Sequence, residues 1–175
     1  MPKRNVKRMC YAALLAAMYL PLSLYAAVQV GNVRISFGSL PVVAAALLFG
    51  PVDAVIVAMV GEFFKQLLTY GVTYTTALYL IPPALRGLVV GLGALALLSL
   101  RGQRLEERRM LCYAVCIVAA VCTTLGNTLV NWLDSVLMGY YFPGLILGDF
   151  VWRLIVGMIN AVVMSSLAIP LVKAL

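Results

Sequence analysis

Six apolar stretches, separated by short polar segments, constrain this sequence more than any other feature. They lie at about 9–30, 35–50, 52–69, 77–99, 110–138 and 149–174. A transmembrane helix needs about 20 residues, so most of these stretches match membrane spans. Only 11% of the 175 residues are charged, against about 25% in soluble domains. We therefore expect an all-α integral membrane protein, with one domain (residues 1–175) in which six transmembrane helices form a bundle in the lipid bilayer.

The distribution of basic residues predicts the orientation of these helices. Gly50-Pro51 interrupts the apolar run 39–69, because proline lacks a backbone donor. If this break separates two helices, both termini and segment 101–109 lie on one side of the membrane. That side carries nine basic residues and the other carries Arg34, which satisfies the positive-inside rule with both termini in the cytoplasm. A single kinked helix would violate the rule, whereas a re-entrant hairpin at 39–69, with four full spans, keeps the same orientation.

Two absences in the sequence restrict the chemistry. The chain has no histidine, which excludes His-dependent nucleophilic catalysis and His-based zinc sites. It also has no G-x-x-x-x-G-K-[ST] phosphate loop, so it does not hydrolyse ATP through that motif. The four cysteines lie in or beside apolar segments without C-x-x-C spacing, and we interpret them as small buried hydrophobes. We expect no catalytic residue, no enzyme activity, no metal and no cofactor, and we attribute the net charge of +7 to membrane orientation rather than to nucleic-acid binding.

Polar residues recur at helical spacing on four of the expected helices. Glu62, Lys65 and Gln66 share one helix face, and the predicted orientation puts them with most other intramembrane polar residues in the outer half of the membrane. Ionisable side chains are costly in lipid, so this one-sided distribution predicts a binding pocket that opens outward. We expect the pocket to be lined by Arg34, Ser36, Glu62, Lys65, Gln66, Tyr74, Tyr79, Arg86, Asn127, Asn131, Trp132, Asp134 and Arg153. The alternative is a set of intrahelical ion pairs beneath an interfacial aromatic belt.

The residue types in this predicted pocket restrict the ligand. Its acidic and basic side chains nearly balance, with Arg34 at the rim in excess, which favours a neutral, zwitterionic or modestly anionic molecule. Aromatic rings beside carboxylates and amides suit a flat heterocycle, and arginine suits a carboxylate, which it can bind through two parallel hydrogen bonds.

Small residues recur near the start of the first helix. Ala12 and Ala16 form one A-x-x-x-A pattern, and Ala13 and Ala17 form a second. Small residues four apart allow another helix to approach closely. The two patterns predict either a docking surface for a partner membrane protein or close packing inside the bundle.

Several motifs together resemble a known family. The strings R-I-S-F-G-S-L-P (34–41) and L-F-G-P (48–51) precede Glu62, and Asn127 and Asn131 precede an aromatic loop and Arg153. This arrangement is similar to the substrate-binding S components of energy-coupling factor (ECF) vitamin transporters, and closest to their folate family. The resemblance covers about residues 9–170.

The resemblance implies a function and partners. An S component of a prokaryotic plasma membrane binds a vitamin from outside, without an ATPase motif of its own. It docks through its first helix onto an ECF transmembrane coupling protein that two ABC-type ATPases drive, and it topples in the membrane to release the vitamin. Folate is the vitamin we expect, with pantothenate, a queuosine precursor, riboflavin and cobalamin as alternatives. A stand-alone proton-coupled transporter that titrates Glu62 is the competing hypothesis.

Overall fold

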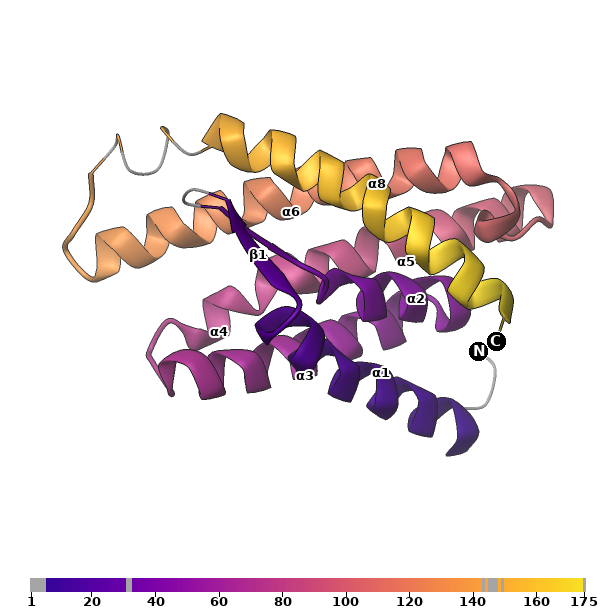
Figure 1. Cartoon of the computed structure of the whole chain (residues 1–175), viewed down its shortest axis with the longest axis horizontal. Coiled ribbons are helices and arrows are strands. Elements are labelled where there is room, and N and C mark those ends of the chain that lie inside the picture. The colour runs from indigo at the N-terminus through magenta and orange to yellow at the C-terminus, as the bar shows by residue number, and fades with distance from the viewer. Residues whose placement is uncertain (1–5, 31–32, 143, 145–147, 149, 175) are drawn as a thin grey trace.

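Six helices of 11 to 29 residues build the computed structural model of the chain, which describes residues 6–30, 33–142, 144, 148 and 150–174. This agrees with the expected all-α membrane fold. A short hairpin and two short helical segments connect the long helices (Figure 1). In chain order the elements are α1 (Val6–Leu24), β1 (Ala27–Val30), β2 (Val33–Ser36), α2 (Ser39–Phe49), α3 (Pro51–Tyr70), α4 (Thr76–Tyr79), α5 (Ile81–Arg101), the 3-10 helix η1 (Leu105–Glu107), α6 (Arg109–Leu137) and α8 (Phe150–Ala174).

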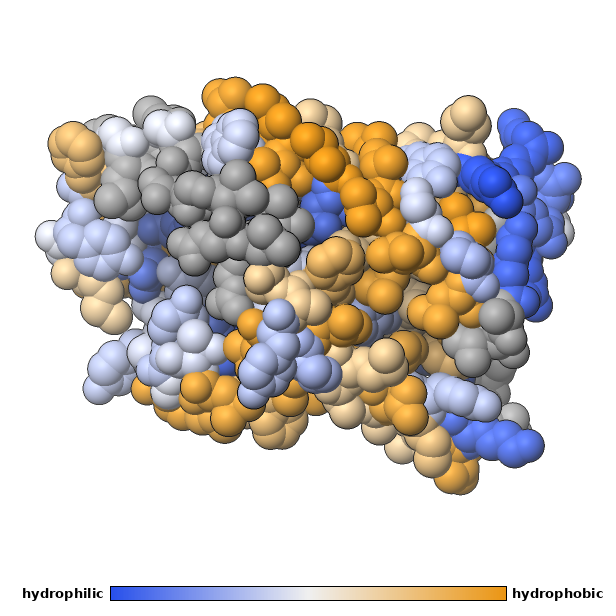
Figure 2. All heavy atoms as spheres, in the orientation of Figure 1, coloured by the Kyte–Doolittle hydropathy of each residue, from blue (hydrophilic) through white to orange (hydrophobic). Residues whose placement is uncertain are grey.

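The lengths of three helical segments and the apolar surface of the bundle suit a bilayer. Within the described residues, the segments Thr76–Arg101, Arg109–Leu137 and Phe150–Lys173 are long and apolar enough to cross a membrane. The 11-residue α2 spans only about 16 Å at 1.5 Å per residue, about half of an apolar bilayer core. Large apolar side chains such as Leu95 and Leu129 stay exposed. Figure 2 shows an apolar middle between two more polar ends, as expected for a surface that faces lipid.

The connection between α1 and α2 differs from the expected one. We expected residues 9–30 to be one helix and a second helix to begin at residue 35, but α1 ends at Leu24 and residues 27–30 pair with 33–36 as antiparallel strands. Val28 and Val30 on one strand and Val33 and Ile35 on the other are β-branched, which favours strands over helix. Gly31-Asn32 between them is a pair typical of tight hairpin turns.

The apolar run 39–69 forms two helices rather than one kinked helix. Gly50 ends α2 with a positive φ of 91°, a conformation that favours glycine, and Pro51 is the first residue of α3. The two helices then pack against each other, and both contact α5.

Glycines allow α3 to pack closely against its neighbours. A Cβ added to Gly87 of α5 would lie 2.9 Å from the backbone of Ala54, and one added to Gly91 would overlap Pro51. A Cβ at Gly61 would lie 2.5 Å from the ring of Tyr19 in α1. Small residues therefore bring the backbones of α3 and α5 together and let the Tyr19 ring of α1 pack directly on α3, as in other membrane bundles.

The basic segments gather at one end of the bundle. The start of α1, the end of α8 and the η1 connection all lie at this end (Figure 1), and Figure 2 shows its hydrophilic surface. Here Arg8 joins three helices: its Nε donates to Asp53 of α3 and its Nη2 donates to the carbonyl of Phe49, the last residue of α2. The Arg8 guanidinium also lies 5.6 Å from the centre of the Phe49 ring. That this end faces the cytoplasm remains a prediction from the charge pattern.

Candidate functional site

A cavity of about 690 Å³ lies between the long helices. It is bounded by the second half of α3, the first halves of α5 and α8, and the second half of α6, so it lies toward the end opposite the basic segments (Figure 1). The close packing of α5 on α3 places Arg86 and Glu62 on neighbouring walls. The lining residues are Tyr19, Ser36, Ser39, Val42, Glu62, Lys65, Gln66, Tyr70, Thr73, Thr75, Tyr79, Pro82, Pro83, Arg86, Thr123, Thr124, Asn127, Asn131, Asp134, Arg153, Val156, Gly157 and Asn160.

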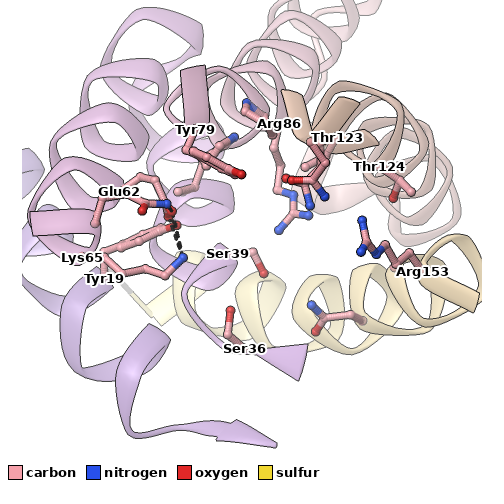
Figure 3. Close-up of a pocket in the computed structure, with 18 of the residues that line it drawn as sticks. Tyr19, Ser36, Ser39, Glu62, Lys65, Tyr79, Arg86, Thr123, Thr124 and Arg153 are labelled. Carbon is pink, nitrogen blue, oxygen red and sulfur yellow. Dashed lines mark hydrogen bonds and ion pairs between the residues drawn. The ribbon is translucent and has the colours of Figure 1, made fainter. Parts of the chain in front are cut away.

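Glu62 is the centre of a hydrogen-bonded group on one wall of the cavity (Figure 3). Its buried carboxylate accepts a bond of 2.5 Å from the Tyr19 hydroxyl and bonds of 2.8 and 3.1 Å from the Lys65 ammonium. The Gln66 amide donates a further bond of 3.0 Å. Lys65 and Gln66 follow Glu62 by three and four residues on α3, which is the spacing that lets helical side chains meet. Tyr19 adds a bond from α1, so this group joins two helices.

Asp134 forms a second group nearer the outer end of α6. Its Oδ2 accepts a bond of 3.1 Å from Tyr79 of α4 and one of 2.5 Å from Tyr140, which follows α6. The bond to Asp134 raises the pKa of Tyr140, because the carboxylate favours the protonated phenol. Asp134 therefore holds together the two connections that border the outer side of the cavity.

A third group of polar side chains lies where α5, α2 and α8 meet at the cavity. It consists of Arg86 of α5, Ser39 of α2 and Asn160 of α8. All three line the main cavity and a small extension of about 10 Å³ beyond it. The side chains of Arg86 and Ser39 point into the cavity (Figure 3). Among the described residues, Arg86 forms no hydrogen bond or ion pair, and the buried Ser39 Oγ and Asn160 Oδ1 have no hydrogen-bond partner.

Most residues that we predicted from the sequence to line a pocket lie together around this cavity. Those that line it are Ser36, Glu62, Lys65, Gln66, Tyr79, Arg86, Asn127, Asn131, Asp134 and Arg153. Tyr74 is 99% exposed and Trp132 is 46% exposed, and neither lines the cavity. The backbone of Arg34 belongs to β2, but its side chain lies outside the described part of the structure.

Several lining residues were not nominated from the sequence. Thr124 and Asn160 continue the helical rows of Asn127 and Arg153, so their spacing already pointed to the same faces. Tyr19 is seven residues after Ala12 and continues the row of Ala12 and Ala16. The other polar residues and prolines are Ser39, Tyr70, Thr73, Thr75, Thr123, Pro82 and Pro83, and most of these come from helix ends and connections, where periodicity gives no signal. The apolar Val42, Val156 and Gly157 complete the lining.

The two alanine patterns of α1 face different surroundings. Ala16 is buried and Ala12 packs against the core, whereas Ala13 and Ala17 are exposed on the outside of the bundle. Leu14 and Met18 lie exposed beside them. One pattern therefore serves packing within the bundle, and the other leaves two small side chains on an exposed apolar surface that a second helix can approach.

An apolar bundle around a polar, ligand-sized cavity defines a membrane-embedded binding protein for a small molecule. The comparison with protein families agrees with this class. A family model described as "ECF-type riboflavin transporter, S component" matches residues 3–175, and the chain belongs to this family. No curated protein matched the chain. The predicted identity as an ECF S component is therefore confirmed: the protein is a vitamin-binding subunit of an ECF transporter, a class that works with a coupling module and ATPases.

Proposed function

We propose that the cavity captures folate from the outer side of a prokaryotic plasma membrane and that the ECF module drives its import. The observation that carries this proposal is the charge of the cavity. Three basic and two acidic side chains line it, and Lys65 is bonded to Glu62. Arg86 forms no hydrogen bond or ion pair among the described residues. An excess of positive charge in a membrane-embedded cavity favours an anionic ligand, and folate carries a planar pterin ring and a glutamate tail with two carboxylates.

Riboflavin is the second candidate, because the matching family is described by that vitamin. Its flat ring suits the walls formed by Tyr70 and Tyr79, and its hydroxyl groups suit Asn127, Asn131 and Thr123. Riboflavin is neutral, however, and leaves the excess positive charge of the cavity unbalanced. Membership of an S-component family favours ATP-driven import for either vitamin over the stand-alone, proton-coupled transporter.

Direct titration tests the proposal and separates the two vitamins. The protein is purified alone in detergent, and folate and riboflavin are titrated by isothermal calorimetry. We expect tight, stoichiometric binding of folate and about 10- to 100-fold weaker binding in Arg86→Gln, as for loss of a charged hydrogen bond. Arg101→Gln, at the other end of α5 and outside the cavity, is the control and should bind normally. Binding of riboflavin but not folate would overturn the choice of vitamin, and binding of neither by folded protein would overturn the receptor function.

We also propose that Ala13 and Ala17 form the surface on which the ECF transmembrane coupling protein docks. Replacing either with leucine puts a bulky side chain where a small one allows close approach, so we expect less coupling protein and fewer ABC-type ATPases to co-purify, with vitamin binding unchanged. Ala96→Leu, at an exposed alanine on α5, is the matched control. Undiminished co-purification of both α1 variants would show that the module docks elsewhere.

A further inference from the structure

The polar group formed by Ser39, Arg86 and Asn160 at the small extension of the cavity is incompletely bonded. We call these three residues the floor subsite. Ser39 is 7% exposed, and its Oγ and the buried Asn160 Oδ1 have no partner in the described structure. The extension beside them, at about 10 Å³, has room for about one water molecule. Buried polar atoms are normally hydrogen-bonded, so the two orphaned atoms beside a guanidinium that makes no hydrogen bond among the described residues mark a place where a bound molecule supplies the missing partners.

The atoms of the floor subsite select one kind of ligand group. The Arg86 guanidinium is purely a donor, Ser39 donates or accepts, and Asn160 Oδ1 is purely an acceptor. A carboxylate offers acceptors alone, so it would bond to Arg86 and Ser39 and would reach Asn160 only if that amide turned to present Nδ2 in place of Oδ1. An acceptor and an N–H donor on adjacent ring atoms satisfy all three residues.

We propose that the floor subsite binds the lactam or imide edge of a planar heterocycle, with a ring carbonyl on Arg86 and the adjacent N–H on Asn160 Oδ1. This inference rests on the proposed vitamin-binding function but not on the choice of vitamin. The pterin ring of folate and the isoalloxazine ring of riboflavin both carry a C4 carbonyl beside an N3–H. The ring therefore enters first, and small rotations of the Ser39 and Asn160 side chains complete the contacts.

The position of Arg153 agrees with ring-first entry. Arg153 precedes Asn160 by seven residues on α8 and so lies about 10 Å closer to the outer end of the cavity. Lys65 also lies on the outer part of the wall, on the side of Glu62 toward the end of α3. A carboxylate tail or a chain of hydroxyl groups thus stays near the mouth, while the ring edge reaches the floor.

Matched ligands test this inference on the unaltered protein. Aminopterin differs from folate at C4, where an amino group replaces the carbonyl and N3 loses its hydrogen. In 3-methylriboflavin a methyl group replaces the N3 hydrogen of riboflavin. For whichever parent vitamin binds, we expect the altered partner to bind at least about tenfold more weakly, as when a buried partner is left unsatisfied. Equal affinities within the pair would overturn the inference while leaving the vitamin-binding function intact.

Variants then assign the effect to the floor subsite. We expect Ser39→Ala and Asn160→Leu each to weaken the parent vitamin about tenfold. We also expect Asn160→Leu to reduce the difference between the parent and its altered partner, since interacting groups are not additive. Ser165→Ala is the control, because Ser165 is a buried serine of α8 that bonds to the Ala161 carbonyl and does not line the cavity.

The outcomes of the variant experiment distinguish failure of the floor subsite from failure of the proposed function. Wild-type affinity in both variants, or an undiminished difference between the paired ligands in Asn160→Leu, would overturn the floor subsite alone. Failure of both parent vitamins to bind folded wild-type protein would overturn the proposed function and the floor subsite together. A glutamate-bearing fragment without a ring, p-aminobenzoylglutamate, separates the alternative: if it loses affinity in Arg86→Gln but not in Asn160→Leu, the floor binds a carboxylate instead.

Discussion

Removing the Tyr19 hydroxyl tests how firmly α1 is bonded to the wall of the cavity. In Tyr19→Phe the ring still packs on Gly61, so the change removes only the bond of 2.5 Å to Glu62. Buried hydrogen bonds to charged groups contribute about 1.5–3 kcal/mol. Because Lys65 and Gln66 continue to bond the carboxylate, Glu62 is not left unsatisfied and the lower end of this range applies. We expect the free energy of unfolding to fall by about 1.5 kcal/mol.

The assay is unfolding by sodium dodecyl sulfate in mixed micelles, followed by the loss of tertiary fluorescence and helical circular dichroism. Tyr113→Phe is the matched control, because its hydroxyl makes an exposed, neutral contact of 3.1 Å with Ser166. Surface changes of this kind stay within about 0.5 kcal/mol. If Tyr19→Phe were no less stable than Tyr113→Phe, the bond between α1 and α3 would have no measurable strength and the reasoning would be refuted.

Two further predictions concern the packing and the outer side of the cavity. Gly91→Ala should lower the free energy of unfolding by about 1–3 kcal/mol, because the added methyl group overpacks against the backbone of α3. The control is Gly93→Ala, whose added methyl group meets only a valine side chain. An equal loss of unfolding free energy in the two variants, measured by the same assay, would contradict this prediction. Asp134→Asn should return the raised pKa of Tyr140 toward its ordinary value of about 10. Since the raised pKa belongs to the folded state, this bond stabilises the fold fully below about pH 10 and is lost as the pH rises through the raised value. Tyrosinate absorbance, with Tyr140→Phe as reference, measures the shift, and an unchanged titration would exclude the bond.

Helical periodicity explains why most of the cavity could be predicted from the sequence. Asn127, Asn131 and Asp134 follow one another by four and three residues, so any helix through them places all three on one face. The same rule explains the error at Trp132. It is adjacent to Asn131, and one residue on a helix turns the side chain by about 100°, which directs Trp132 away from the cavity.

Connections gave less information than helices. Tyr74 lies between α3 and α4, where no periodicity fixes the direction of a side chain, and it is exposed. The β-hairpin was missed because its valines extend an apolar run that continues from α1, and apolarity alone does not separate strand from helix. Ser39 has no polar neighbour at helical spacing on α2, so only the packing of α2 against α8 brings it to Asn160.

The clamp made by Arg8 has a mechanical consequence. One guanidinium bonds α1 to the end of α2 and to the start of α3, and Tyr19 bonds α1 to α3 again three turns further along. A rod fixed at two separated points cannot pivot about either of them. A force applied to α1 between these points, where Ala13 and Ala17 lie, is therefore transmitted to α2 and α3 as well. It moves the cavity wall formed by α3 together with α1 and does not bend α1 alone.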